Sequence, residues 1–372
     1  MIALFTATFV GFGGVLVLLG ATQEALAESL GLGLAETGQL AAALSLGLAL
    51  GIAGAGPLVD RAPRRPIFVA ANLLAGATLS LADAGWGRAG IALAVASVGF
   101  AVGALETLMN AAIADRYAER AARPLAGVHV GVNLGAVAAP PLLGALAAAS
   151  GWPGAFRALG ALFLLAALLG TLVPLPRPRG HAARAAGGRL PLGALLPLGL
   201  VAACYVGLET ALTVFAVPYA RDGLGLEPGS GIAAISGLWL GIGGGRILLA
   251  LWRSPVDARH LAAAGFIGAL VLAGSVALRV EPLPLAMAAF GLSIGGIFPL
   301  LMALAAQRAP TAAGTAAGLV GGCGAAGGLA VPWLTGALGD AAGPTTAVAS
   351  LAAWCLAVAG LALLAWRRRD QP

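Results

Sequence analysis

Two acidic residues lie inside long apolar stretches of the sequence, where a charged side chain is energetically unfavourable. Glu106 lies in the stretch 89–114 and Glu209 in the stretch 192–220. A carboxylate in hydrocarbon is costly unless it faces a cavity, meets a partner or carries a proton, so such acids are functional candidates by default. We expect both to couple proton movement to the activity of the protein. The alternative is that each one only organises hydrogen bonds in a packed interior.

Polar residues accompany both acids at helical spacing. Asn110 follows Glu106 by four residues, and Tyr205 and Thr213 lie four residues before and after Glu209. Residues four apart share one face of a helix, and a polar stripe on an otherwise apolar helix should face the interior. We therefore expect Asn110 and Tyr205 to contact a bound substrate.

Other apolar stretches hold further candidates. Polar or aromatic side chains that we expect to contact substrate are Gln23, Asn133, Trp239 and Phe298. Glu24 is a third candidate for proton coupling. His129 shares a helical face with Asn133 and could titrate near neutral pH, or it could serve packing alone.

Arg246 is a cation inside an apolar stretch. It follows Trp239 by seven residues, which places both on one helical face. It could pair with an acid or an anionic substrate, or extend its long side chain to the membrane surface. We expect a gating or structural role.

Composition indicates which elements must hold these residues. Of 372 residues 60% are hydrophobic and 10% are charged, with a mean hydropathy of +0.96, whereas an ordinary globular chain is about 25% charged. So few charges cannot cover a soluble surface. Divided by twelve, the chain gives about 31 residues per unit, enough for one spanning helix and a connection.

The apolar stretches predict an all-α membrane protein with twelve transmembrane helices. They run without alternation over about 20 residues, unlike the strands of a barrel, and lipid then permits only helices. The expected spans are 3–26, 37–58, 66–84, 89–114, 124–149, 155–174, 192–220, 230–252, 260–279, 284–307, 312–338 and 345–366.

The positive charges predict the orientation. All 21 basic residues are arginines, and sixteen of them cluster after even-numbered spans. This positive-inside bias predicts cytoplasmic N- and C-termini and a multi-pass protein of the cell inner membrane. A polybasic role on lipid or RNA is the alternative reading of the net charge of +6, and we expect no nucleic-acid partner.

A basic, Gly- and Pro-containing break at residues 174–191 divides the chain at its middle. We expect an N-terminal six-helix half at 1–174, a cytoplasmic linker at 175–190 and a C-terminal six-helix half at 191–372. Two such halves describe a parallel-repeat secondary transporter, with its substrate site between the halves near the bilayer midplane. No nucleotide-binding G-x-x-x-x-G-K-[ST] loop is present, so an ion gradient or simple facilitation must drive transport.

The segment 56–65, GPLVDRAPRR, lies between the second and third spans. It resembles the loop between helices two and three of the major facilitator superfamily. We expect Gly56 to permit close helix approach and Asp60 to accept from arginines or a helix N-terminus, as a latch made in one state and broken in another. The gating residues are then Gly56, Asp60, Arg61, Arg64 and Arg65, unless the arginines only set topology.

Within that superfamily, four segments resemble the fucose permease type of proton symporter. They are GALET at 103–107 with Asn110, YVGLE at 205–209, the stretch from Trp239 to Arg246, and the stretch from Gly291 to Pro299. The resemblance implies proton-coupled uptake of a sugar-like or small organic solute and strengthens Glu24 as a coupling residue. It departs at Phe215, where the family often has Trp, and in the first span, which lacks an Asn/Asp-rich stretch.

Other classes of function fit less well. Three cysteines in separate apolar stretches form no metal motif or disulfide framework, and no catalytic cluster is evident. We therefore expect neither enzymatic activity nor a cofactor. We also expect the protein to be a monomer. A Pro-containing stretch at 139–144 is similar to a pattern of drug/proton antiporters, which leaves efflux as an alternative. A transporter-like sensor or assembly partner is a further one.

Glycines recur at four-residue spacing in several spans. Examples are Gly47 and Gly51, Gly127, Gly131 and Gly135, Gly241 and Gly245, and Gly324 and Gly328. Such ridges let membrane helices approach closely, and we expect them to serve the contact between the halves. The alternative is that an Ala- and Gly-rich coding bias produces them by chance.

Overall fold

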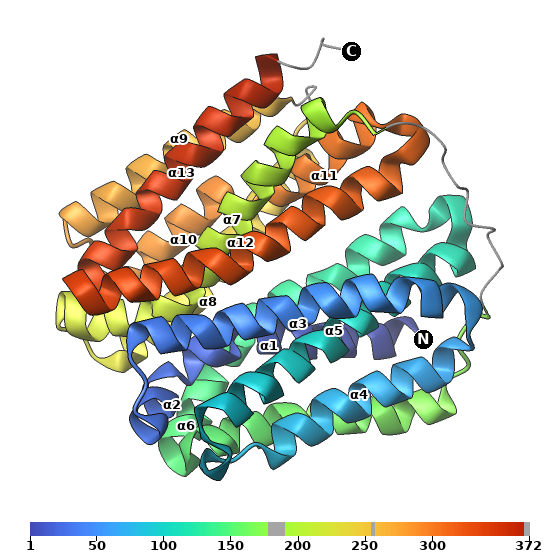
Figure 1. The fold of residues 1–372 in the computed structure, drawn as a ribbon, viewed down its shortest axis with the longest axis horizontal. Coiled ribbons are helices and arrows are strands. Elements are labelled where there is room, and N and C mark those ends of the chain that lie inside the picture. Colours follow the sequence, from blue (N-terminus) through green and yellow to red (C-terminus); the bar gives the residue numbers. More distant parts are fainter. Residues whose placement is uncertain (178–189, 254–256, 368–372) are drawn as a thin grey trace. The chain divides into compact units, whose positions relative to one another are not determined.

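The structure is a computed structural model that describes residues 1–177, 190–253 and 257–367. Every regular element in these ranges is helical, and no strand occurs in them (Figure 1). Ten of the helices are long and apolar enough to cross a membrane, judged by length and composition. The expectation of an all-helical membrane protein is therefore confirmed.

The first part of the chain forms six α-helices. They are α1 (Ile2–Ala21), α2 (Gln23–Leu30), α3 (Leu34–Arg61), α4 (Arg64–Leu81), α5 (Gly87–Tyr117) and α6 (Ala122–Leu172), with short 3-10 turns η1 (Ala84–Trp86) and η2 (Ala118–Arg120). Helix α6 contains two of the expected spans, because its backbone leaves helical geometry at Ser150 and Gly151. Gly151 has φ of 71°, in the left-handed region that glycine adopts without steric cost.

The second part of the chain forms seven α-helices. They are α7 (Leu192–Pro218), α8 (Pro228–Leu251), α9 (Ala258–Ala277), α10 (Leu283–Ile294), α11 (Ile297–Arg308), α12 (Ala313–Ala342) and α13 (Pro344–Arg367), with a π-turn η3 (Tyr219–Gly223) and a 3-10 turn η4 (Pro310–Ala312).

Two expected spans are interrupted in the structure. The span expected at 3–26 ends at Ala21, where Thr22 leaves helical geometry and its hydroxyl donates to the Leu18 carbonyl at 2.8 Å. The span expected at 284–307 is divided at Gly295 and Gly296 into α10 and α11, although both glycines keep right-handed helical dihedrals and Leu283–Arg308 together is one of the ten membrane-length helices. Glycine weakens a helix by about 1 kcal/mol relative to alanine, and two in succession favour this break.

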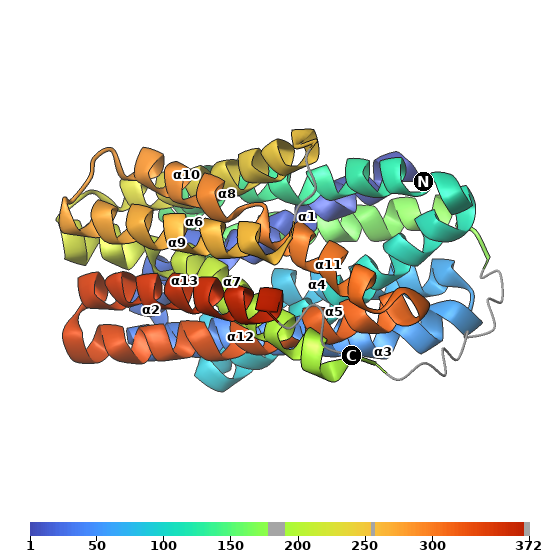
Figure 2. The same cartoon turned by 90° about the horizontal axis from the view of Figure 1, so that it is seen from above.

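The chain divides into two compact units. Unit 1 comprises Met1–Leu32 and Gln39–Arg184, and unit 2 comprises Gly33–Gly38 and Ala185–Pro372. In unit 1, α1 packs along α6, and α4 packs against α5 and α6. In unit 2, α7 packs along α12, α8 along α10 and α9 along α13 (Figure 2).

The recurring glycines lie where helices of one unit cross. A Cβ atom at Gly241 would overlap the carbonyl oxygen of Ala288 in α10, and one at Gly131 would lie 2.7 Å from the carbonyl oxygen of Thr6 in α1. Gly47 has the same relation to Ala96 in α5. These contacts join helices within a unit.

Candidate functional site

A polar cluster in unit 2 begins on a single helix. Tyr205 and Glu209, one turn apart on α7, form a hydrogen bond in which the Tyr205 hydroxyl donates to Glu209 Oε2 at 2.5 Å. Tyr205 is only 1% exposed, whereas Glu209 is partly exposed. The spacing of four residues thus places both side chains on one helical face, and the hydrogen bond holds the carboxylate in one orientation.

Arg246 on α8 belongs to the same cluster. Its charge acts on both Glu209 and Tyr205, and it also hydrogen-bonds to the Tyr205 side chain. Of the roles expected for this arginine, an electrostatic interaction with an acid is the one that the structure supports. The Glu209 carboxylate thus has a hydroxyl donor and an arginine charge in its surroundings.

Aromatic residues from two further elements complete the unit 2 cluster. Trp239 on α8 donates from Nε1 to Thr213 Oγ1 at 3.2 Å, and the Thr213 hydroxyl donates to the Glu209 carbonyl at 2.8 Å. Phe298 on α11 stacks on Tyr205, with ring centroids 6.2 Å apart. Five residues singled out in the sequence thus come together from three helices: Tyr205, Glu209, Trp239, Arg246 and Phe298.

Unit 1 contains a second polar cluster between α5 and α6. Asn110 Oδ1 and His129 Nε2 are 3.0 Å apart, and the His129 ring lies 4.6 Å from that of Phe9 on α1. Because the amide oxygen accepts, His129 carries its proton on Nε2 in this arrangement. Asn133 lies one turn further along α6 and is partly buried.

Glu106 differs from Glu209 in its surroundings. It lies one turn before Asn110 on α5 and is partly exposed, yet within the described ranges no hydrogen bond or ion pair to its carboxylate is found. Glu209, by contrast, has a hydroxyl donor and an arginine. Glu209 therefore has protein partners for its carboxylate, whereas Glu106 has none among the described residues.

Gln23 and Glu24 lie outside the first membrane-length helix. Both belong to the short helix α2, after the break at Thr22. Gln23 is 4% exposed, and Glu24 is partly exposed in the first turn. The break at Thr22 thus separates both residues from α1, the helix that carries Phe9 of the unit 1 cluster.

The segment 56–65 is organised around an ion pair that the sequence did not reveal. Arg64 is 3% exposed, and its Nη2 lies 2.6 Å from Asp115 Oδ2 near the end of α5. Asp60, Arg61 and Arg65 are exposed. In the sequence, Asp115 directly follows the apolar stretch 89–114. An acid at the end of an expected span was the sequence signal available for this ion pair.

Gly56 has a different setting from the expected one. No described atom lies within 4 Å of the position that its Cβ would occupy, so no close approach of another helix is seen there.

Neither a cluster of metal ligands nor a disulfide occurs in the described part of the chain. No group of three or more His, Cys, Asp or Glu side chains there could hold a metal ion. The three cysteines, Cys204, Cys323 and Cys355, are free thiols.

These features define a helical membrane protein with polar clusters built on apolar helices, and comparison with known families agrees. The family model described as the Major Facilitator Superfamily matches residues 4–332. The chain therefore belongs to the Major Facilitator Superfamily. No curated protein matches the sequence.

Solved structures of transporters share the fold. A bacterial homolog of the human lysosomal transporter Spinster, inward-facing and unoccupied, has 16% sequence identity and a TM-score of 0.77, covering 99% of this chain and 96% of that chain. A mutant of the nucleoside transporter NupG has 12% identity and a TM-score of 0.81, with 98% of each chain covered. A D-xylose–proton symporter has 15% identity and a TM-score of 0.78, covering 98% of this chain and 96% of that chain.

The family and these neighbours point to a transporter and not an enzyme. Their substrates differ, so the shared fold does not specify a solute.

Proposed function

We propose that this protein is a secondary active transporter that moves a small polar solute, sugar-like or otherwise organic, by proton-coupled alternating access. We place it as a monomer of twelve spanning helices in the cell inner membrane, with both termini cytoplasmic. Within the superfamily we propose the fucose permease type of symporter, on the motifs around Glu106 and Glu209.

The observation on which the proposal rests is the contrast between the two acids. Glu209 has a hydroxyl donor at 2.5 Å and an arginine nearby, whereas Glu106 has no described partner for its carboxylate. A transporter that couples to protons needs an acid whose compensation changes during the cycle. We propose that Glu106 carries the proton and that Glu209 takes part through exchange of its partners, with Glu24 as a further participant.

The proposed substrate contacts are side chains able to hold a polar, ring-shaped solute. Tyr205, Trp239 and Phe298 offer aromatic faces, and Tyr205 and Trp239 also carry a polar group. Tyr205 stacks on Phe298, and Trp239 is held by its hydrogen bond to Thr213. Amide groups for hydrogen bonds to hydroxyls would come from Asn110, Asn133 and Gln23.

We propose that the segment 56–65 and Arg246 control access. The buried Arg64–Asp115 pair supports this role because ion pairs of this kind can be made in one state and broken in another. The exposed side chains of Asp60, Arg61 and Arg65 are available for partners in a different state.

Purified protein in liposomes tests the proposal. A thermal-shift screen with sugars, nucleosides, organic acids and dyes identifies a ligand, since a bound ligand stabilises by RT ln(1 + [L]/Kd). Uptake of that ligand is then followed together with internal pH from a trapped dye. Symport predicts solute-driven acidification of the lumen, which is lost in Glu106→Gln and Glu209→Gln and retained in Glu28→Gln, an exposed acid of α2.

The main alternative is proton-driven efflux of drugs or metabolites. Efflux predicts proton movement opposite to that of the solute in the same liposomes. If both glutamine variants transport and acidify like wild type, the proposed coupling residues are wrong.

A further inference from the structure

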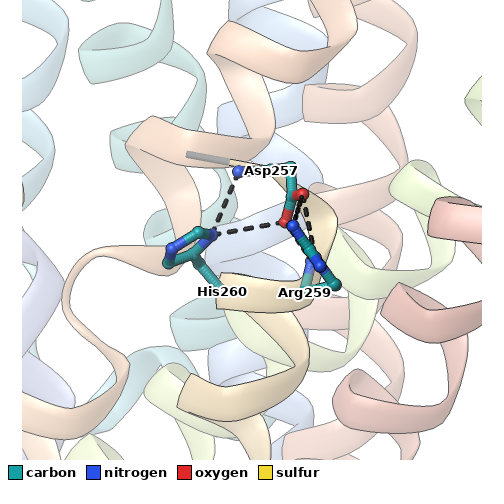
Figure 3. A network of polar contacts seen from close by, with 3 residues as sticks. All are labelled: Asp257, Arg259 and His260. Carbon is teal, nitrogen blue, oxygen red and sulfur yellow. Dashed lines mark hydrogen bonds and ion pairs between the residues drawn. The ribbon is translucent and has the colours of Figure 1, made fainter. Parts of the chain in front are cut away.

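The N-terminus of α9 is closed by a reciprocal pair of side chains, Asp257 and His260 (Figure 3). The Asp257 carboxylate accepts from the Arg259 backbone N–H at 2.9 Å. The Asp257 backbone N–H donates in return to His260 Nδ1 at 3.1 Å. Such a capping box ordinarily has Glu or Gln at the third helical position, neither of which needs a proton change to accept. Histidine makes this one sensitive to protonation.

The two contacts of His260 Nδ1 demand opposite proton states. To accept from the Asp257 backbone, Nδ1 must have a free lone pair, so the ring is neutral with its proton on Nε2. The same nitrogen lies 3.3 Å from Asp257 Oδ1. A carboxylate only accepts, so a bond there requires a proton on Nδ1. Only one of the two bonds is therefore formed at a time.

We propose that His260 and Asp257 form a proton-operated switch in the cap of α9. In the neutral state, His260 Nδ1 caps the Asp257 backbone N–H. When a proton from solvent binds Nδ1, the imidazolium turns to the Asp257 carboxylate and the backbone N–H is released to water. Histidine is the side chain whose charge ordinarily changes between about pH 5 and 8.

The surroundings allow this exchange. The His260 side chain is 39% exposed, so solvent protons reach it. Arg259 binds the same carboxylate, with Nη2 2.9 Å from Oδ2, and lies over the Trp366 ring of α13. The Trp252 ring stands edge-on to the imidazole, with ring centroids 6.3 Å apart.

No described carboxylate other than Asp257 pairs with the imidazole. Among helices packed against α9, α10 has no ionisable side chain; the ionisable residues on α11 and α13 are Arg308, Cys355 and Arg367. The Arg308 guanidinium is bound by the carbonyls of Ala194 and Ala365. When His260 is protonated, it therefore competes with Arg259 for the Asp257 carboxylate. Because Arg259 also lies over Trp366, this competition links the cap to the contact between α9 and α13.

Nitrogen NMR of histidine tests the switch directly. The chain has only three histidines, so protein labelled with ¹⁵N-histidine in nanodiscs gives few ring signals, and His260→Gln identifies that of His260. We expect an Nε2–H tautomer at pH 8 and an imidazolium at pH 5, with the Asp257 amide signal shifting at the same midpoint. An Nδ1–H tautomer at pH 8, or an Asp257 amide signal that does not shift as His260 is protonated, would overturn the proposal.

Hydrogen exchange provides a second and independent measure. After correction for intrinsic rates, protection of the Asp257 amide should fall about fivefold from pH 8 to pH 5 in wild type, the effect of one ordinary hydrogen bond. His260→Gln keeps an acceptor that does not titrate and should remain protected at both pH values. His260→Lys has only donors and should remain unprotected. A pH step that persists in His260→Gln would refute the switch, whatever the outcome of the transport assays.

Discussion

The Arg64 guanidinium and the Asp115 carboxylate form an ion pair at 2.6 Å, with side chains only 2% and 13% exposed. The pair joins the start of α4 to the end of α5. Asp60, which belongs to the same motif as Arg64, is exposed instead. The buried partner of the motif's arginine is thus a residue 51 positions further along the chain.

Removing the charge of Asp115 should destabilise unit 1. Asp115→Asn leaves the buried Arg64 charge without its carboxylate, and breaking a buried pair in this way costs about 3 kcal/mol or more. Unfolding by denaturant in detergent measures the loss. Asp60→Asn is the matched control and should lie within about 0.5 kcal/mol of wild type. Equal effects of the two variants would show that the pair contributes nothing particular.

Neutralising Glu106 and neutralising Glu209 should change the stability of the protein by different amounts. Glu106→Gln removes no described contact, so the free energy of unfolding should change by less than about 0.5 kcal/mol. Glu209→Gln weakens the bond from Tyr205 and removes the charge that faces Arg246, which should cost about 2 kcal/mol. Thermal unfolding of both variants at one pH makes the comparison, and the reverse order would contradict the assignment of compensated and uncompensated acids.

The hydrogen bond from the Trp239 indole to Thr213 should contribute to the stability of the protein. Thr213→Val keeps the side-chain shape but leaves Trp239 Nε1 without its acceptor, at a cost of about 1–3 kcal/mol because the group is buried. Thr210→Val is the control, since among the described residues the Thr210 hydroxyl bonds only to the carbonyl one turn earlier. Denaturant unfolding compares the two variants, and similar losses would argue against a specific role for the bond.

Replacing either of two glycines in α8 by alanine should change the stability of the protein, and the two changes should have opposite signs. At Gly241 a methyl group would meet the α10 backbone, which cannot move without shifting a helix, so Gly241→Ala should cost about 1–3 kcal/mol. At Gly243 nothing lies within 4 Å, and Gly243→Ala should gain about 0.5–1 kcal/mol from helix propensity. The difference in melting temperature between the variants gives the sign directly.

Asp257 should make stability depend on acid pH. Partial burial alone would raise the pKa of its carboxyl, but hydrogen bonds from the Arg259 side chain and backbone, the charge of Arg259 and the His260 contact outweigh it and lower that pKa. The native state therefore favours the ionised form. Its stabilising effect is complete above the unfolded pKa of about 3.9 and is lost as pH falls through the lower native pKa.

Asp257→Asn isolates this effect, because asparagine still caps the helix without a charge. Wild type should be the more stable protein at pH 5–7, and the difference should shrink below about pH 4. Melting temperatures measured from pH 3 to pH 7 test this, and a constant difference across the range would rule out the charge as its source.

Local sequence patterns predicted some of these features and missed others for physical reasons. Continuous apolar stretches predicted helices because lipid permits little else, and four-residue spacing predicted that Tyr205 and Glu209 share one helical face. The bond between Asn110 and His129 was not predicted, since it depends on how α5 packs against α6. Asp115 was missed for the same reason: its partner lies on another helix.

The helix breaks were also missed. Thr22 lies inside an apolar stretch, and hydropathy does not register where a backbone leaves helical geometry. As a result, Gln23 and Glu24 were assigned to the first span, whereas they belong to α2.

The close helix crossings at glycine also constrain how the chain can evolve. Glycine and alanine codons differ by a single base, so a sequence this rich in both residues meets the exchange often. Positions such as Gly243, with open surroundings, can drift freely, whereas Gly47, Gly131 and Gly241 abut backbone atoms of a neighbouring helix. Selection should therefore remove alanine from the crossings while coding bias acts on the rest.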